Sequence, residues 1–197
     1  MRLDLYQTGT YTPGAPLWKQ VAWYAFGHPV VAGCLPFSSL KVAVLRAFGA
    51  QIGTGVRVKP GLRVKFPWRL SVGNHSWLGP AWIDNLAAVQ IGNHVCISQD
   101  AYLCTGSHDW SDTRFALRNE AITIEDGAWI GARAIVGPGV KVGEHAVLTL
   151  GSVATKDLQP NRIYAGNPSV PIKSRVIKAE QPAGDTAGKS SPANGTL

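Results

Sequence analysis

One histidine stands at the edge of the longest irregular stretch of an otherwise regular sequence. Residues 101–110 read AYLCTGSHDW, and the pattern that surrounds them is lost over the following eleven residues. An imidazole with an unperturbed pKa near 6.5 can accept a proton from a hydroxyl group at neutral pH. We therefore predict that His108 is a general base at the mouth of a cleft. The alternative is an ordinary surface histidine in a loop.

The remaining histidines and the cysteines point to structural roles. His75, His94 and His145 share one slot of a six-residue repeat, a turn position that most simply faces solvent. Cys104 precedes His108 by four residues, which leaves covalent catalysis open, although buried and inert thiols are commoner. The three cysteines have no CxxC spacing, which indicates a reducing compartment.

A six-residue period runs through the centre of the chain. It favours short strands joined by tight turns, because a single strand has period two and a helix 3.6. A small or β-branched residue often stands in the fifth slot, and glycine often follows the aliphatic residue. The aliphatic residues in register are Ile52, Val58, Val64, Val72, Leu78, Ile91, Ile97, Leu103, Ile124, Ile130, Val136, Val142 and Leu148.

The limits of the repeat divide the chain. We expect an N-terminal apolar and helical segment at 1–49, a repeat region at 50–158 with a loop at 109–121, a C-terminal cap at 159–178 and a disordered tail at 179–197. The tail is rich in Pro, Gly, Ser and Ala. Loops that leave a rigid scaffold often carry binding residues, so the loop is the first place to look for a site.

This repeat resembles that of the hexapeptide acyltransferases. The resemblance covers about residues 50–173 and implies an all-β fold, a left-handed parallel β-helix with a small N-terminal helical segment and a C-terminal cap. It also implies a homotrimer with active sites between neighbouring subunits. The stretch TGSHD, Thr105 to Asp109, is similar to the motif that carries the catalytic histidine of sugar and xenobiotic O-acetyltransferases.

Four further stretches narrow the resemblance. LRAFGAQIG, RVKFPWRLSVG, CISQDAYLCTGSHDW and IYAGNP are similar to the WcaF-type acetyltransferases of colanic acid and exopolysaccharide synthesis. The implied reaction moves an acetyl group from acetyl-CoA, a co-substrate, to a sugar hydroxyl, with His108 taking the hydroxyl proton. The acceptor would be a sugar or a lipid-linked sugar.

The resemblance also implies residues for the two substrates. Phosphates of acetyl-CoA favour Lys and Arg, and residues 156–177 carry four basic and one acidic residue. An asparagine that galactoside-type enzymes use on the acceptor side falls on Leu78 here, so the acceptor residues are sought nearby. The expected donor-site residues are Trp129, Gly131, Ala132, Ser152, Thr155, Lys156, Lys173 and Arg175. Those expected on the acceptor side are Asp84 (in what looks like an aliphatic slot), Asn85, Asp109 and Trp110.

Two other classes of function stay open. The repeat region could be a non-catalytic scaffold or ligand-binding module. It could also be a metal enzyme like the γ-class carbonic anhydrases, since His75 and His94 are nineteen residues apart, about one coil. Both lie in turn slots and no third histidine has a matching spacing, so we expect no metal.

Charge and hydropathy suggest where the protein works. The net charge of +7 has no accompanying nucleic-acid-binding motif, so we expect no nucleic acid partner. The start lacks the features of a signal peptide, which predicts a cytoplasmic protein. Residues 20–40 carry no charge but are interrupted by Gly33 and Pro36, which favours a packed or membrane-surface segment over a span. The basic residues Arg57, Lys59, Arg63, Lys65 and Arg69 are expected to form a belt around the first coil. We offer the hypothesis that this belt binds an anionic membrane surface, which would place the protein at the inner face of the membrane.

Overall fold

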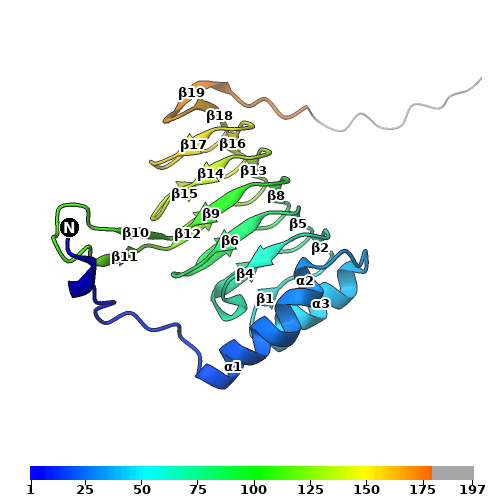
Figure 1. The fold of residues 1–197 in the computed structure, drawn as a ribbon. Coiled ribbons are helices and arrows are strands. Elements are labelled where there is room, and N and C mark those ends of the chain that lie inside the picture. Colours follow the sequence, from blue (N-terminus) through cyan, green and yellow to red (C-terminus); the bar gives the residue numbers. More distant parts are fainter. Residues whose placement is uncertain (179–197) are drawn as a thin grey trace, which may run out of the picture.

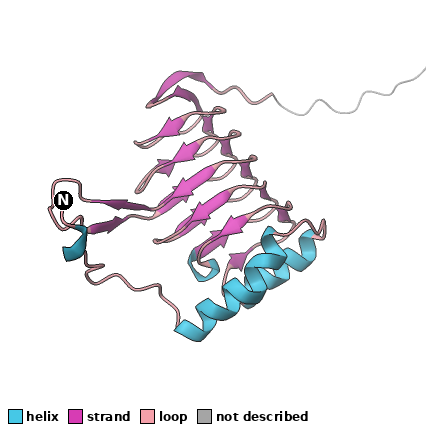
Figure 2. Ribbon diagram, viewed as in Figure 1, coloured by secondary structure: helices cyan, strands magenta, loops and turns pink. Residues whose placement is uncertain are grey.

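The chain folds into a three-sided prism of short parallel strands with helices at one end (Figure 1). The computed structural model describes residues 1–178. The tail expected at 179–197 therefore lies outside the described residues. Helices cover the N-terminal end of the prism, and a β-hairpin closes the opposite end (Figure 2).

Each face of the prism is one sheet, in which parallel strands pair with those one coil away, and the second sheet ends in an antiparallel hairpin. The first face contains β1 (Gln51–Ile52), β4 (Leu70–Val72), β7 (Val89–Ile91), β12 (Ile122–Ile124) and β15 (Lys141–Val142). The second contains β2 (Arg57–Val58), β5 (Trp77–Leu78), β8 (Cys96–Ile97), β13 (Trp129–Ile130), β16 (Val147–Leu148), β18 (Arg162–Gly166) and β19 (Ser169–Ser174). The third contains β3 (Arg63–Val64), β6 (Trp82–Asp84), β9 (Tyr102–Cys104), β14 (Ile135–Val136) and β17 (Val153–Ala154).

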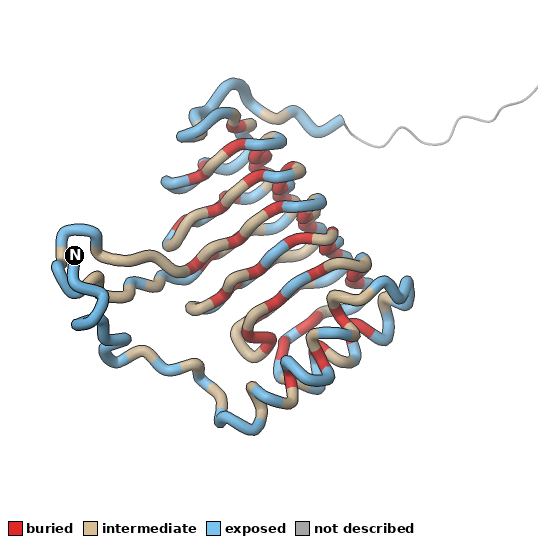
Figure 3. The backbone as a smooth tube through the Cα atoms, in the orientation of Figure 1, coloured by how far each residue is buried: buried red, intermediate tan, exposed pale blue. Residues whose placement is uncertain are grey.

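The six-residue period follows from this geometry. Two-residue strands place one side chain outward and the next inward, and four residues turn the corner to the next face. The aliphatic residues of the repeat stack in the interior. Figure 3 colours the buried positions of each coil red. Burial of each such side chain contributes about 1.5–3 kcal/mol, so the column stabilises the whole prism. The predicted fold class is confirmed.

The corners explain the three histidines in the turn slot. His75, His94 and His145 share a corner and a left-handed backbone, with φ of 58°, 54° and 56°. The rings of His75 and His94 stack at 5.2 Å on the exposed surface. At the same corner Gly127 has φ of 66°, and a Cβ there would lie 2.0 Å from Nδ1 of His145. These histidines form part of the turns, as the repeat predicts.

The N-terminal segment packs against the end of the prism. A helical run consists of α1 (Leu17–Ala22), the π-helical η2 (Trp23–Gly27) and α2 (His28–Ala32), and α3 (Ser38–Ala47) follows. Trp23 is buried and its Nε1 donates to the carbonyl of Val64 at 3.1 Å. Lys41 is also buried, and its ammonium group donates to the carbonyls of Val30, Val31 and Gly33 at the end of α2. Within residues 1–178, every helix is too short or too polar to cross a bilayer.

The irregular stretch is an antiparallel hairpin that projects from the third corner of the prism (Figure 1). Its strands are β10 (Gly106–His108) and β11 (Leu117–Asn119), and we call residues 106–119 the arm. The sequence pattern predicted an irregular loop at 109–121. The chain leaves the prism three residues earlier, at Gly106, and the second half of the predicted loop contains the strand β11. The short helix η1 (Leu3–Leu5) lies beside the arm. A second short helix, η3 (Pro67–Arg69), lies in the first coil.

Candidate functional site

The arm is fixed to the prism by a buried threonine. Thr105, which is fully buried, accepts the N–H of Ala87 at its hydroxyl oxygen and donates that hydroxyl to the carbonyl of Asp84. Its own carbonyl accepts the N–H of Glu120, which ends the arm. Satisfied polar groups of this kind hold a buried position rigidly. The arm therefore starts from a fixed base.

His108 lies at the end of β10 and is held by a residue across the arm. Its Nδ1 lies 3.0 Å from the carbonyl oxygen of Phe115, and the two rings stack with centroids 4.0 Å apart at 6°. A carbonyl only accepts hydrogen bonds, so the neutral ring carries its proton on Nδ1. Nε2 then keeps its lone pair. The imidazole is oriented as a proton acceptor.

A small cleft opens beside the imidazole. Its volume is about 220 Å³, and its walls include Arg118 of the arm, Glu120 just after the arm and Pro138 of the same corner in the next coil. Tyr6 of the N-terminal segment contacts the imidazole, with ring centroids 5.8 Å apart. The backbone N–H of Arg2 donates to the carbonyl of Thr113 at 2.7 Å and holds this segment on the arm.

The two residues that follow His108 line the same cleft. Asp109 accepts the N–H of Ser111 at 3.0 Å and its hydroxyl at 2.5 Å, and it pairs with Arg118. These contacts, those of Ser111 foremost, lower the pKa of Asp109 to about 2. Trp110 is 88% exposed at the tip of the arm. Of the residues expected on the acceptor side, these two are the ones that lie beside the imidazole.

The other two expected acceptor residues have structural partners. Asn85 is fully buried, accepting the N–H of Phe66 at 2.9 Å and donating to its carbonyl at 2.7 Å. Asp84 forms an ion pair with Lys65 at 2.9 Å and accepts the hydroxyl of Tyr102 at 3.1 Å.

Asp84 also faces a different part of the molecule. It lines a separate pocket next to Tyr24 and His28 of the helices. The aliphatic slot that the sequence assigned to Asp84 belongs to Ile83, which pairs with Val64 and Leu103 and is fully buried. A shortened corner at Pro80 shifts the register by one residue, which the sequence pattern did not reveal.

The expected donor-site residues are spread over three corners of the prism. Gly131, Ala132 and Ser152 share the corner after the second face, where the N–H of Gly151 donates to Ala132. The hydroxyl of Ser152 is buried and accepts the N–H of Gly166 at 3.0 Å. Trp129 stands on the adjoining face and donates to the hydroxyl of Ser98 at 2.9 Å.

The remaining expected donor-site residues lie elsewhere. Thr155 and Lys156 are exposed on the arm's corner, in the coil above Pro138. Lys173 is exposed on β19. Arg175 reaches the histidine corner, where one guanidinium nitrogen donates to the carbonyls of Gly127 and His145 at 2.9 and 3.0 Å. One extended ligand along one corner of one chain cannot contact all of these residues.

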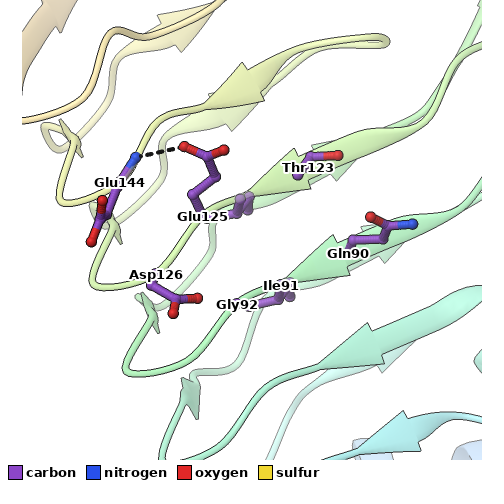
Figure 4. Close-up of a pocket in the computed structure, with 8 residues that line it drawn as sticks. Gln90, Ile91, Gly92, Thr123, Glu125, Asp126 and Glu144 are labelled. Carbon is purple, nitrogen blue, oxygen red and sulfur yellow. Dashed lines mark hydrogen bonds between the residues drawn. The ribbon is translucent and has the colours of Figure 1, made fainter.

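A hollow on the first face, away from the arm, has a volume of about 480 Å³. Figure 4 shows its acidic side chains. Glu125 accepts the N–H of Glu144 at 2.9 Å and pairs with Lys141 at 2.7 Å. Asp126 accepts the N–H of Asn93 at 2.8 Å. These carboxylates complete corner turns and pair with neighbouring coils.

Cys96 and Cys104 lie on strands β8 and β9 of the prism. The thiol of Cys104 lies 3.2 Å from the carbonyl of Gly106, and burial raises the pKa of Cys96. A raised pKa disfavours the nucleophilic thiolate of Cys96. Among residues 1–178, no group of three His, Cys, Asp or Glu side chains has the arrangement of a metal site.

Sequence reasoning missed the partners that hold His108. Phe115 sits seven residues further on with φ of 54°, an unusual conformation for a bulky residue. Glycine or asparagine would have marked such a turn, but phenylalanine does not. Tyr6 comes from more than a hundred residues away, and no local pattern signals that contact.

Comparisons with known proteins place this geometry in context. No family model matches the chain. It is 38% identical over 137 residues to the colanic acid biosynthesis acetyltransferase WcaF of Escherichia coli, covering 69% of this chain and 75% of that one. It is 28% identical over 142 residues to galactoside O-acetyltransferase of Lactococcus lactis, covering 69% and 68% of the two chains.

A solved structure supports the fold. The hexapeptide-repeat acetyltransferase of Vibrio cholerae, in complex with acetyl coenzyme A, superposes with a TM-score of 0.76 at 20% identity. The alignment covers 88% of this chain and 97% of that one.

Proposed function

Since the chain belongs to the hexapeptide-repeat acetyltransferases, in the group that contains WcaF, we propose that it transfers an acetyl group from acetyl-CoA to a sugar hydroxyl with His108 as general base. The observation that carries the proposal is the contact between Nδ1 of His108 and the carbonyl of Phe115. It leaves Nε2 to accept a proton, which is the task that this reaction sets.

The proposed step balances without a covalent intermediate. The hydroxyl oxygen attacks the thioester carbonyl while its proton passes to Nε2 of His108. The C–S bond then breaks, and the departing sulfur takes that proton and leaves as the free thiol. The Nδ1–H bond to Phe115 stabilises the charged ring between the two transfers.

We propose that the donor site lies between two copies of the chain in a homotrimer. The expected donor residues occupy three corners of one prism, so a groove between neighbouring prisms can combine a corner of one copy with a corner of the next. Lys156 lies on the same corner as the arm that carries His108, and Gly131 and Ala132 lie on another. The distribution of these residues supports an assembled site.

The residues that line the cleft and the names of the relatives both support a sugar as the acetyl acceptor. The cleft is lined by Asp109, Trp110, Arg118 and Glu120, whose carboxylates, guanidinium and indole suit hydroxyl groups and sugar-ring faces. WcaF is named for colanic acid biosynthesis, and a galactoside O-acetyltransferase is a more distant relative. An exopolysaccharide precursor, free or attached to its lipid carrier, is the proposed acceptor. A lipid-linked sugar places the protein at the inner face of the membrane.

Thiol release from acetyl-CoA tests the function. The purified protein is incubated with acetyl-CoA and a panel of nucleotide sugars, oligosaccharides and glycolipids, and products are identified by mass. We expect release that depends on the sugar and a mass increase on an acetyl ester. Release of equal rate without any sugar, with no acetylated product, would overturn the proposal.

A further inference from the structure

The outer face of the helical run is mostly apolar. Trp23, Gly27 and Val31 face the prism and are buried, whereas the opposite side of the same run faces solvent. Leu17, Trp18 and Phe26 are 74%, 71% and 72% exposed. The exposed apolar side chains on this outer side are Leu17, Trp18, Val21, Ala25, Phe26 and Pro29. Tyr24 is 47% exposed, and its hydroxyl donates to the carbonyl of Lys65.

The segment that follows extends the same surface. Leu35 and Phe37, in the loop after α2, are 43% and 60% exposed, and Leu40 and Ala43 are exposed on α3. Together with the outer side of the helical run they form what we call the apolar end of the prism. Figure 3 shows the exposed positions along these helices in pale blue. A contiguous apolar surface of this kind is rare on a monomer and marks an interaction site.

The charged residues near the apolar end of the prism indicate which kind of partner it binds. Residues 5–83 contain no Asp or Glu, and their basic residues are Lys19, Lys41, Arg46, Arg57, Lys59, Arg63, Lys65 and Arg69. Lys41 is buried as a cap. Arg46 is exposed on α3, where its guanidinium donates to the carbonyls of Ile52 and Gly53, and Arg57 and Lys59 are exposed in the first coil, beside the helices. Two such ends carry charge of the same sign and repel each other, which disfavours a second copy as partner.

We propose that the apolar end of the prism binds an anionic lipid bilayer and lies in its interfacial layer. Trp18 and Phe26 enter the boundary between headgroups and acyl chains, and the exposed basic side chains contact lipid phosphates at the rim. The run from 17 to 32 is about 24 Å long by its helical rise, shorter than the hydrocarbon core, and Trp23 anchors it to the prism. Binding is therefore on the surface. The inference deepens the proposed function, on which its link to a lipid-linked acceptor rests.

The docking geometry has a consequence for catalysis. The helices lie across one end of the prism, and the arm projects from its side (Figure 1). In a trimer of parallel prisms three apolar ends face the same way, so three weak contacts act together. A lipid-linked sugar is then presented along the side of the prism that carries His108.

Flotation with vesicles tests the proposal. The full chain is mixed with phosphatidylethanolamine vesicles containing phosphatidylglycerol, or with phosphatidylcholine alone, at about 0.1 M salt. We expect flotation with the anionic vesicles and at least tenfold less with the neutral ones. The double variant Trp18→Ser/Phe26→Ser should lose at least tenfold of the bound fraction. Lys59→Gln should lose about fivefold, the expected contribution of one basic side chain near an anionic surface.

The matched control is Val176→Ser/Ile177→Ser, which removes two exposed apolar residues beyond the opposite end of the prism. It should float like the wild type. Absence of flotation of the wild type, or equal flotation of the two double variants, would overturn the proposal. A change of oligomeric state in Trp18→Ser/Phe26→Ser alone would assign the surface to a second copy instead.

A soluble assay separates this inference from the proposed function. Thiol release with a water-soluble acceptor and no vesicles should be the same in Trp18→Ser/Phe26→Ser as in the wild type. Loss of all transfer with flotation intact would reject the proposed function and leave membrane binding standing. Transfer without flotation would do the reverse.

Discussion

The ring of Phe115 stacks on that of His108 at 4.0 Å, while its carbonyl oxygen lies 3.0 Å from Nδ1 of the same imidazole. One residue thus fixes both the plane and the protonated nitrogen of the proposed base. The backbone of Phe115 adopts φ of 54° to present both groups at once.

Removing the Phe115 ring should reduce catalysis without weakening donor binding. In Phe115→Ala the carbonyl remains but the stacked ring is lost, so the imidazole can rotate out of line. Misplacement of about 1 Å can cost about 10²-fold, and we expect kcat to fall about 10- to 100-fold with KM for acetyl-CoA unchanged. Phe115→Tyr, which keeps the ring, should retain activity. Wild-type kcat in Phe115→Ala would show that stacking does not position the base.

The turn of the arm should titrate at unusually low pH. The pKa of Asp109 is lowered to about 2, first by the hydroxyl and N–H of Ser111. Because this pKa is depressed from about 3.9, the charged carboxylate stabilises the arm above about pH 4, and that contribution is lost as pH falls through 2. Carboxyl NMR should find the low midpoint, and Ser111→Ala should raise it. Thr113→Ala, on the same turn, should leave it in place.

Replacing Asn85 should lower the stability of the fold and leave acceptor binding unchanged. Asn85→Ala leaves the buried N–H and carbonyl of Phe66 without their partner, at about 1–3 kcal/mol for each group. We expect the free energy of unfolding to fall by about 2–4 kcal/mol in denaturant titrations, while Gln159→Ala, at an exposed position, changes it little. A folded Asn85→Ala with normal stability and a raised KM for the sugar would return this residue to the acceptor site.

The basic residues near the C-terminal end should separate into two classes. Lys156→Ala and Lys173→Ala should raise KM for acetyl-CoA about tenfold, the value of one exposed charge-assisted hydrogen bond. Arg175→Ala should lower the melting temperature with little change in KM, because its guanidinium holds two backbone carbonyls. Lys178→Ala is the control for loss of charge. Unchanged KM in both lysine variants would remove them from the donor site.

The scaffold was readable from the sequence because each aliphatic slot reports one buried position. Ile91, Ile97 and Leu103 differ by six and stack as predicted, and His94 lies in a corner turn, as the repeat indicated. A single omitted residue breaks this logic. At Pro80 the shortened corner moved Ile83 inward, so Asp84 was assigned to a slot that it does not occupy.

Of the candidate site, the sequence predicted only the residues at which the repeat is interrupted. His108 stood out because the repeat fails there, but its partners come from tertiary folding. Phe115 approaches because β10 and β11 pair, and Tyr6 approaches because Arg2 bonds to the arm. The spread of the expected donor residues over three corners likewise depends on which strand follows which face, which the resemblance alone did not reveal.

The most direct test of the account compares two histidines of the same chain. His108→Ala removes the proposed base, and His94→Ala removes an exposed corner histidine with a left-handed backbone. With acetyl-CoA and an accepted sugar, we predict that His108→Ala lowers kcat about 10²- to 10⁴-fold while the protein stays folded, and that His94→Ala retains wild-type kcat. A folded His108→Ala variant that acetylates the sugar at the wild-type rate would contradict the account.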